Sequence, residues 1–425
     1  MKHLISCTII SFALNLLNPR STQSQSSDLG EWFTRASLPT SRQEMPHAVL
    51  NGKIFVPGGF RSGGSATNVV EVFYPATNSW STVTPLPVIM HHLHVASANG
   101  KLYVLGGYET SNFSPSNRVF EYNPQSTSWT SKTNMPTARG AGVAVEFGGK
   151  IFVIGGAAGA ALGVNEIYDP INNTWTSRAS MPTSREHLAA GAIDSLIYVV
   201  GGRVGSTNRN TLEAYSPASN RWYTRASMPT ARGGLTAAAL HGRLYVFGGE
   251  FFGSSGSGVF EETEEYDPAT NTWRALEPMP VPRHGLGAAA IGDSIFLIGG
   301  GPVAGFGVTD VNSLFIPPAV VTRVADNLPP ANFKLFQNYP NPFNPTTTIR
   351  FSIAISAEVS LKIYDVFGRE MVTLLKGKIN PGEHELLWRA DDLASGVYFY
   401  RLEVKPLSAS SSFRFSDMKK MVLLK

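Results

Sequence analysis

Residues 150–185 of this chain read KIFVIGGAAGAALGVNEIYDPINNTWTSRASMPTSR. The stretch begins with a short apolar run that ends in a Gly-Gly pair at residues 155–156. A Tyr-Asp-Pro turn follows, and its proline, Pro170, lies five residues before Trp175. Short β-rich runs bounded by turn residues are typical of strands joined by tight connections. The stretch therefore predicts three successive short strands of an all-β protein.

The same features recur along the chain at a nearly constant spacing. Gly-Gly pairs begin at residues 58, 106, 155, 201, 248 and 299. A repeat of this length indicates an array of similar units that bury their faces against one another. Six tryptophans keep the same rhythm at intervals of 46–51 residues, and they are Trp32, Trp80, Trp129, Trp175, Trp222 and Trp273.

Each repeat reads as four strands, and its fixed residues have physical reasons. Paired glycines at the end of the second strand can take dihedral angles that a side chain would forbid. The tyrosine and tryptophan are large enough to fill the space between adjacent sheets. Because a four-stranded sheet cannot bury both of its faces alone, we expect the repeats to stack radially as the blades of a β-propeller.

The pattern GG…YDP..N.W…MP..R resembles the kelch repeat, and the resemblance covers residues 31–317. It implies a kelch β-propeller. The last repeat has its Gly-Gly pair at 299–300 and LFIP at 314–317 but no tryptophan after them, whereas Trp32 has no repeat before it. We therefore expect the strand EWFTRAS (31–37) to complete the last blade. That gives six blades within residues 27–317 and removes the exposed edges of the array.

Ligand binding is expected on one face of the propeller. The connections between the second and third strands vary in length and chemistry, and variable loops on a rigid scaffold usually carry binding residues. On the same face, an arginine follows the Met-Pro-type proline by three residues in five of six repeats. Arginine suits the recognition of carboxylates and other anions. The residues expected to bind a ligand at the channel mouth are Arg42, Arg139, Arg185, Arg232, Arg283, His92, His187, Tyr108, Arg203, Phe251 and Phe252.

Alternatives stay open for the arginines and the histidines. The arginines could instead brace neighbouring blades as part of the repeat. HHLH at residues 91–94, together with His187 and His284, offers several imidazoles on the same face. A zinc site needs three or four converging ligands, and the spacing reveals no carboxylate partner. We therefore expect no metal and no cofactor, with the histidines lining a polar channel.

The N-terminus indicates export. Lys2 and His3 precede a mostly apolar run at 4–17 and a polar STQSQSS segment, which is typical of a secretory signal peptide within residues 1–26. A buried N-terminal segment is the alternative. The only cysteine, Cys7, lies inside this signal, so the mature chain would have no disulfide and no thiol nucleophile. It would also have no transmembrane segment. A net charge of +4 does not favour binding to nucleic acid.

The last part of the chain departs from the repeat. A proline-rich linker is expected at 318–332, and alternating runs such as VSLKIYDV predict a small β-sandwich. The ordered motifs NYPNPFNPTTTIRFSI (338–353), LKIYDVFGREMVTLL (361–375), GVYFYRLE (396–403) and KKMVLLK (419–425) resemble the type A C-terminal sorting domain of the type IX (Por) secretion system. The resemblance covers residues 333–425 and implies an immunoglobulin-like fold, contact with that secretion machinery, and a secreted or outer-membrane surface protein of a Bacteroidota-like bacterium. A carbohydrate-binding sandwich is the alternative.

Three functions are compatible with these features. The first is a binding protein whose arginine-lined face contacts an unknown glycan, peptide or protein, and the absence of a catalytic motif favours it. The second is an enzyme similar to the periplasmic kelch-type N-acetylneuraminate epimerases. In that case arginines would hold a sugar carboxylate, and Glu44, Glu186, His187 or His92 would transfer protons. The third is a structural adhesion component without a small ligand.

Overall fold

The computed structural model describes residues 29–253, 256–318, 321–324, 333–407 and 414–425, so the predicted signal peptide lies outside the described residues. These residues form strands, together with one short 3-10 helix, η1 (Ser62–Gly64), which confirms the all-β fold. Contacts divide the chain into two compact units, with the division after Pro318. No helix in the described part of the chain is long and apolar enough to cross a membrane.

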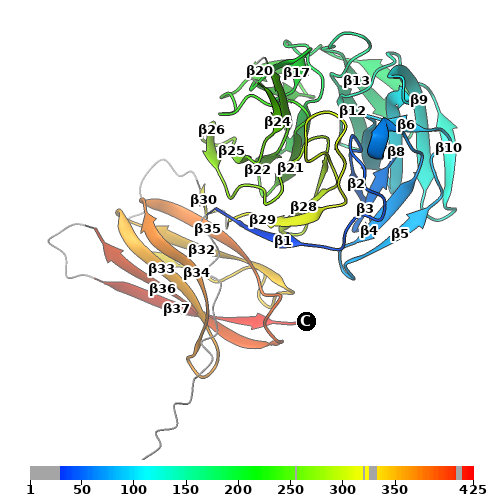
Figure 1. The fold of residues 1–425 in the computed structure, drawn as a ribbon. Coiled ribbons are helices and arrows are strands. Elements are labelled where there is room, and N and C mark those ends of the chain that lie inside the picture. The colour runs from blue at the N-terminus through cyan, green and yellow to red at the C-terminus, as the bar shows by residue number, and fades with distance from the viewer. Residues whose placement is uncertain (1–28, 254–255, 319–320, 325–332, 408–413) are drawn as a thin grey trace, which may run out of the picture. The chain divides into compact units, whose positions relative to one another are not determined.

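The first unit consists of antiparallel sheets arranged as blades around a central channel (Figure 1). In five blades the chain starts at the channel and runs up and down through four strands, and in the last blade it runs through three strands before β1 adds the fourth. The first three blades are formed by β2 (Ala48–Leu50), β3 (Lys53–Pro57), β4 (Val70–Tyr74) and β5 (Ser79–Val83); β7 (His94–Ala98), β8 (Lys101–Glu109), β9 (Ser114–Asn123) and β10 (Ser128–Lys132); and β11 (Val143–Phe147), β12 (Lys150–Ile154), β13 (Asn165–Asp169) and β14 (Thr174–Ser177).

The next three sheets repeat this order, and short additional strands extend their loops. The sheets contain β15 (Ala189–Ile193), β16 (Leu196–Val200), β19 (Leu212–Ser216) and β20 (Arg221–Thr224); β21 (Thr236–Leu240), β22 (Arg243–Phe247), β25 (Thr263–Asp267) and β26 (Thr272–Ala275); and β27 (Gly287–Ile291), β28 (Ser294–Ile298), β29 (Asn312–Ile316) and β1 (Glu31–Thr34). The additional strands are β6 (Met90–His91), β17 (Arg203–Val204), β18 (Thr207–Asn208), β23 (Glu250–Gly253) and β24 (Gly256–Val259).

The N-terminal strand closes the propeller, as the repeat pattern predicts. β1 pairs antiparallel with β29, from Glu31 opposite Ile316 to Thr34 opposite Ser313. The Trp32 ring lies 4.7 Å from the ring of Phe315, measured between centroids. The two ends of the array therefore share one sheet, so neither the first nor the last repeat presents an unpaired edge.

The repeated tryptophan and asparagine join each blade to the one before it. Trp175 packs on Tyr168 of its own blade with ring centroids 5.0 Å apart, and its Nε1–H donates to the carbonyl of Thr133 at 2.9 Å. Asn173, at φ 54°, accepts the backbone N–H of Thr133 through Oδ1 at 2.9 Å. The other five tryptophans donate in the same way, to the carbonyls of Glu277, Ala36, Thr84, Ala179 and Ala226. The asparagine and tryptophan of the N.W pattern thus join neighbouring blades by hydrogen bonds.

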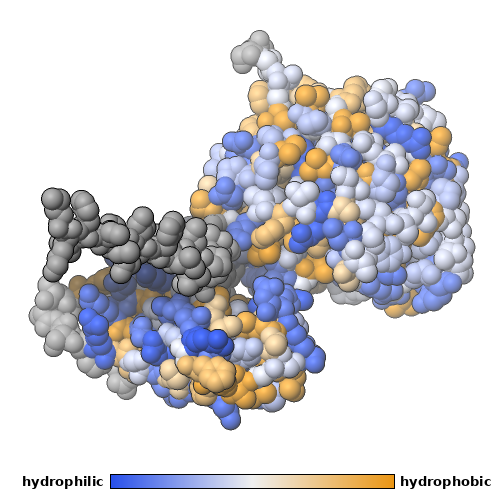
Figure 2. Space-filling model, turned by 60° about the horizontal axis from the view of Figure 1, so that its bottom comes forward, coloured by the Kyte–Doolittle hydropathy of each residue, from blue (hydrophilic) through white to orange (hydrophobic). Residues whose placement is uncertain are grey.

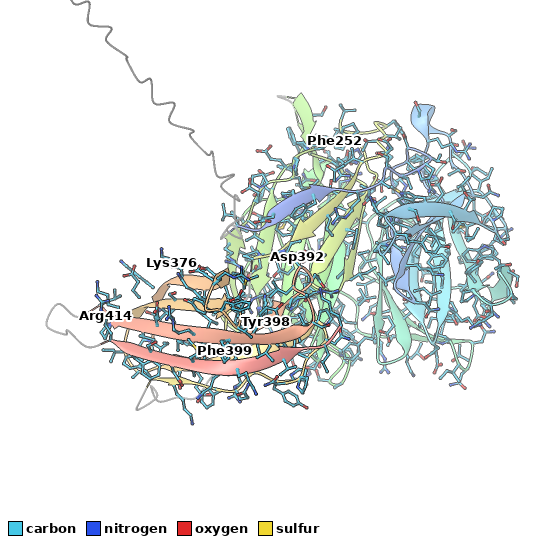
Figure 3. The ribbon with its side chains drawn as sticks, turned by 90° about the horizontal axis from the view of Figure 1, so that it is seen from below. Phe252, Lys376, Asp392, Tyr398, Phe399 and Arg414 are labelled. Atoms are coloured by element: carbon cyan, nitrogen blue, oxygen red, sulfur yellow. The ribbon has the colours of Figure 1, made fainter. Side chains whose placement is uncertain are left out.

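The second unit is a sandwich of two antiparallel sheets. Its buried core takes side chains from both sheets, among them Phe351, Leu361 and Tyr400. Neighbouring residues of a strand alternate between faces: Tyr398 is buried in the core, whereas Phe399 is half-buried (Figure 3). One sheet contains β30 (Val321–Val324), β35 (Gly382–Arg389), β32 (Thr346–Ile353) and β31 (Lys334–Leu335), and the other contains β34 (Glu370–Ile379), β33 (Ala357–Tyr364), β36 (Gly396–Pro406) and β37 (Phe415–Leu423).

Two details of this unit bear on the sequence predictions. The segment expected to be a linker contains β30, whose backbone pairs with β35, so part of it belongs to the sandwich. The proline-rich start of the tail adds isolated bridges, between Tyr339 and Thr348 and between Phe343 and Leu423, and no long strand. Because those bridges reach β32 in one sheet and β37 in the other, the segment covers an edge of the sandwich, as the proline content predicts.

Candidate functional site

The five arginines of the repeat do not face the channel mouth, which corrects the expectation that they bind a ligand. Each side chain is completely buried inside the blade that follows it. Arg185 donates to the carbonyls of Gly201 and Thr211 and forms an ion pair with Glu213 at 2.7 Å. Arg42, Arg139 and Arg232 make equivalent pairs with Glu71, Glu166 and Glu264, and Arg283 contacts Ser313 Oγ at 3.1 Å. The arginines brace the second and third strands of single blades.

Covariation between the repeats carries a sequence signal for this role. The partner stands four residues before the proline of the YDP turn, and it is glutamate in four of the five arginine-containing blades. In the second blade the arginine is replaced by Met90 and the glutamate by Phe120, and both are buried in one apolar cluster. In that blade arginine and carboxylate are lost together, which avoids an unpaired buried charge, whereas in the last blade Arg283 keeps its burial with Ser313 in place of the glutamate.

A ring of backbone hydrogen bonds surrounds the channel, two residues beyond the arginine position. In each blade one N–H donates to the carbonyl of the preceding blade's equivalent residue, over distances of 2.7–3.0 Å. All of these residues have φ between 49° and 65°. Glycine takes such angles freely, whereas a residue with a side chain does so at an energetic cost. The ring residues are Glu44, His92, Ala141, His187, Gly234 and Gly285.

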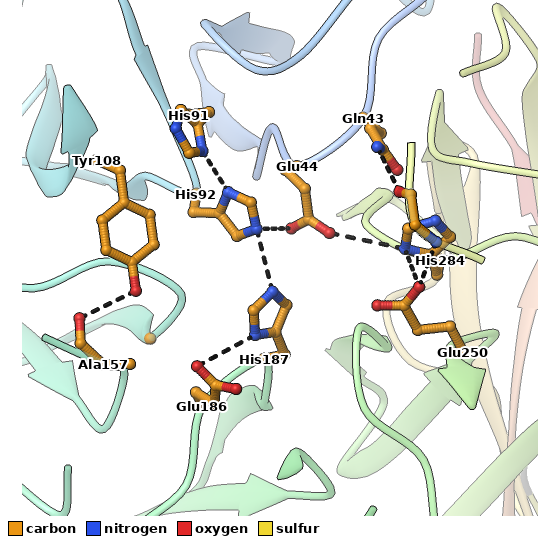
Figure 4. Close-up of polar contacts among 12 residues, drawn as sticks. Gln43, Glu44, His91, His92, Tyr108, Ala157, Glu186, His187, Glu250 and His284 are labelled. Carbon is orange, nitrogen blue, oxygen red and sulfur yellow. Dashed lines mark hydrogen bonds and ion pairs between the residues drawn. The ribbon is translucent and has the colours of Figure 1, made fainter. Parts of the chain in front are cut away.

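Three ring residues bring polar side chains together at the mouth of the channel (Figure 4). His92 Nε2 lies 3.0 Å from His187 Nε2 and 3.3 Å from Glu44 Oε2. The other nitrogen of His92, Nδ1, lies 2.5 Å from Nδ1 of His91. Glu44 is the carboxylate partner that sequence spacing did not reveal for the histidines. Strained backbone that carries converging polar groups is typical of functional sites.

A second group of charged side chains adjoins the first. Arg203 donates to Glu250 Oε1 at 2.6 Å, and its Nε lies 3.5 Å from Glu186. Glu250 Oε2 accepts the Gly305 N–H at 2.9 Å and lies 3.2 Å from His284 Nδ1. That same nitrogen of His284 is 3.6 Å from Glu44 Oε1, so the two groups form one continuous network.

Burial and mutual charge set the protonation of this network. Burial alone would raise the pKa of Glu44, but the neighbouring His92, His284 and His187 hold that pKa well below its ordinary value. Burial lowers the pKa of His92 well below its ordinary value and favours the neutral imidazole, while the Glu44 carboxylate acts in the opposite direction. Burial also acts to lower the pKa of His284, but Glu44 and Glu250 outweigh it and raise that pKa. An ionised carboxylate therefore stands beside an imidazole whose neutral form is favoured by burial.

Aromatic rings border the polar network. Phe60 stacks on His91 with centroids 3.9 Å apart and contacts Phe113 and Phe306 at 5.8 and 5.7 Å. Phe113 is 45% exposed and Phe306 is 58% exposed, so both present ring surface to solvent. Below the mouth, the channel has a volume of about 220 Å³ and is lined mostly by small and apolar residues. Elsewhere on the propeller, hydrophobic and hydrophilic residues are interspersed over the face that Figure 2 displays.

The other predicted ligand residues have different outcomes. His92, His187 and Arg203 lie in the network, and Tyr108 lies beside it, with its ring centroid 5.6 Å from that of His92. The guanidinium of Arg203 lies 5.5 Å from the Phe252 ring centroid. Phe251 packs on Phe260 within the β23–β24 hairpin region.

Sequence reasoning missed the role of Glu250. It directly follows the Gly-Gly pair at 248–249, and Arg203 and Tyr108 hold the same position in their own repeats. The position directly after the glycine pair could therefore have indicated Glu250 as a site residue. It pairs with the residue that follows the arginine position, as in the bridges of Glu186 with Arg203 and of Gly233 with Glu250.

The fold and the site define a closed β-propeller with a polar site at its channel mouth, joined to a β-sandwich. A family model described as "KLHDC2/KLHL20/DRC7 Kelch-repeats domain" matches residues 90–300, and a "Kelch motif" model matches residues 41–87. A model described as "Secretion system C-terminal sorting domain" matches residues 337–413. The chain therefore carries kelch repeats followed by a secretion-system sorting domain, which confirms both resemblances.

Individual relatives match only part of this chain. The kelch-like protein terF of Aspergillus terreus (strain NIH 2624 / FGSC A1156) is 44% identical over 62 residues, which are 15% of this chain and 14% of that protein. This chain thus spans only a small part of that relative's length. The solved structure of YjhT superposes with a TM-score of 0.57 at 15% identity, over 69% of this chain and 98% of that one. That likeness concerns the fold alone.

Proposed function

We propose that this secreted kelch protein binds a neutral carbohydrate at the mouth of its channel. The observation that carries the proposal is the convergence of Glu44, His92 and His187 beneath exposed aromatic rings on a rigid scaffold. Binding sites for small molecules typically combine aromatic walls with a few fixed polar groups. A sugar has apolar ring faces and hydroxyl edges, so it matches both kinds of surface.

The charges at the mouth argue against an anionic ligand. Glu44, Glu186 and Glu250 contribute three carboxylates to the network. Arg203 is engaged by Glu186 and Glu250, and the five repeat arginines are buried inside the blades. An acidic sugar or peptide would therefore bring its charge next to carboxylates, which is unfavourable. Hydroxyl groups can donate to those same carboxylates, and the resulting hydrogen bonds are of the stronger, charge-assisted kind.

A glycan array with neutral and acidic glycans tests this proposal. We expect the purified chain to bind neutral glycans, and we expect F113A or F306A to weaken the best interaction at least fivefold, because losing an aromatic anchor costs on the order of 1 kcal/mol or more. Y223A is the matched control, since Tyr223 is also an exposed aromatic residue but lies on the outer strand β20. Selective binding of acidic glycans would contradict the proposal. An empty array together with strong attachment to cells would support an adhesion role instead.

A second candidate function, proton transfer on a sugar, is favoured by the His92–His187 contact. Glu44 lies 3.3 Å from His92, and Glu186 lies 3.8 Å from His187 Nδ1. Each imidazole thus has a carboxylate that could orient it as an acid or a base. Screening for epimerisation or mutarotation would detect such activity, and E186Q and H187Q should abolish it. Turnover that survives both substitutions would exclude this site.

A further inference from the structure

We propose that Glu44, His92 and His187 form a binding site for one divalent transition-metal ion, with zinc as the ion that suits the ligands best. The three side chains offer two imidazole nitrogens and one carboxylate oxygen, and these atoms all lie within 4.8 Å of one another. Two histidines and one glutamate are the ligand set of several catalytic zinc sites. The inference concerns the side chains themselves, and the three carboxylates disfavour an anionic ligand only in the metal-free chain, because a bound divalent ion would offset their charge.

Two of the three distances between the ligand atoms fit a tetrahedral ion, and the third is at most 4.8 Å. Ligands at about 2.0–2.1 Å from zinc lie roughly 3.3 Å apart along the edges of a tetrahedron. His92 Nε2 is 3.3 Å from Glu44 Oε2 and 3.0 Å from His187 Nε2. An ion can therefore bind with only small movements of these side chains. Their backbone is held in place by the hydrogen-bonded ring, which supplies the rigidity that a metal site needs.

Outer contacts lie on the side of each imidazole that faces away from the proposed ion, a hydrogen bond for His92 and a nearby carboxylate for His187. His91 Nδ1 lies 2.5 Å from His92 Nδ1, so a proton shared on that side leaves His92 Nε2 free to bind an ion. Glu186 approaches His187 on its Nδ1 side, at 3.8 Å, and Arg203 lies 3.5 Å from Glu186. Metal-binding histidines usually have such a partner on the nitrogen that does not bind the metal.

The remaining contacts favour this position over the adjacent one. Glu44 also belongs to a second group with Glu250 and His284. There, however, both Glu250 oxygens already accept hydrogen bonds, from Arg203 and from the Gly305 N–H. The Glu44 carboxylate occupies the space beside Gly285, since a Cβ added to Gly285 would lie 2.5 Å from Glu44 Oε1. Gly285 thus leaves room for the carboxylate, and His284 contacts the oxygen that faces away from His92.

Three protein ligands leave a fourth coordination position for a water molecule or a ligand hydroxyl. Catalytic and ligand-binding zinc sites keep such a position, whereas structural sites fill all four with protein. The site lies at the mouth of the channel, beside the aromatic border formed by Phe60 and Phe113. A bound ion would therefore be reachable by a small molecule entering the mouth.

Metal titration of the full mature chain, purified without a polyhistidine tag and stripped with a chelator, tests this inference. We expect one Zn²⁺ per chain, and we expect Co²⁺ to give the visible absorption of a four-coordinate ion. E44Q and H187Q should weaken Zn²⁺ binding by more than about a hundredfold, beyond the 10–100-fold loss typical of outer partners. Because glutamine keeps the size of glutamate, E44Q is expected to fold, and circular dichroism without metal checks this for both variants.

H241Q is the matched control. His241 lies 3.1 Å from Asp293 on a turn outside the network, so it is another histidine–carboxylate pair in the propeller. Its substitution should leave Zn²⁺ affinity unchanged. The proposal is overturned if the wild-type chain binds no Zn²⁺ or Co²⁺. It is equally overturned if E44Q and H187Q bind as tightly as wild type, or if only H241Q loses the ion.

Discussion

His47 is a histidine of the channel wall whose burial links the stability of the propeller to pH. It follows the Glu44 segment, is buried, and places Nε2 3.2 Å from the carbonyl of Ile298 in another blade. A Cβ added to Gly287 would lie 2.3 Å from the ring, so glycine is required where the imidazole crosses β27. Burial lowers the pKa of His47 to about 4. The folded protein therefore keeps this imidazole neutral under conditions in which the unfolded chain protonates it.

This burial predicts acid destabilisation of the propeller through His47. The unfolded chain takes up a proton near pH 6.5, whereas the folded chain does so near pH 4, so stability falls as the pH drops between those values. The loss should reach about 3 kcal/mol at most. Urea unfolding of wild type and H47Q at pH 7.5 and pH 4.5 measures it, and H47Q should lose less stability than wild type. Equal losses in both proteins would show that the ring is not buried in a neutral form.

At the residue scale, the sequence predicted several residues of the site correctly but predicted the role of the repeat arginines wrongly. His92, His187 and Arg203 were predicted and lie in the network. The repeat arginines were misplaced because their number and register resemble a ring of ligands, whereas their side chains turn into the blades. Glu44 and His92 belong to consecutive repeats, as do Glu250 and His284. However, His187 reaches His92 from a non-adjacent blade, and Glu44 meets His284 only between the first and last blades. The radial arrangement and closure of the propeller bring these groups together, and the spacing within one repeat does not show which side chains will meet.

At the scale of the element, the Arg–Glu pair is what fixes the inter-blade segment to its blade. The buried guanidinium of Arg185 reaches the ends of β16 and β19 through the carbonyls of Gly201 and Thr211. Glu213 supplies the compensating charge, and its other oxygen accepts a hydrogen bond from Thr183 Oγ1 at 3.0 Å. The blade with Met90 and Phe120 shows that an apolar pair can replace the entire arrangement.

Breaking one of these pairs should be costly. We expect E213Q to lower the free energy of unfolding by about 3–5 kcal/mol, because it leaves Arg185 buried without a countercharge. In the last blade, S313A removes only a hydroxyl partner of Arg283 and should cost about 1 kcal/mol. Chemical denaturation of the two variants compares them directly. A similar small cost for both would mean that the carboxylate does not stabilise the arginine.

Most strands could be predicted, since turn residues bracket them in every repeat. In the tail, the last eight residues of the motif at 338–353 form β32. β30 and β31 were not expected, because one lies within a proline-rich stretch and the other has two residues. Each is a strand only through pairing with β35 or β32, and such long-range pairing leaves little trace in local composition.

At the scale of the whole molecule, the chain consists of two compact units, each with buried cores of its own. The propeller has its own closed set of sheets and its own cores between blades. The sandwich has a separate core that draws on both of its sheets. The sorting-domain match implies that the type IX secretion machinery handles the second unit, so export is assigned to the sandwich, whereas the proposed ligand site lies on the propeller.

This division predicts that the propeller folds but is not exported when the second unit is removed. The cut belongs after residue 318, since a cut at 331 would leave β30 without its partner β35. In a host with a type IX secretion system, the chain ending at residue 318 should accumulate in the periplasm, whereas the full chain should reach the surface or the medium. Cell fractionation measures the distribution, and the melting transition of the purified fragment checks that the closed β1–β29 sheet is intact. If the shortened chain were exported as efficiently as the full chain, the sandwich would not be the export signal. The sandwich would then have another function, such as binding a ligand through its exposed surface.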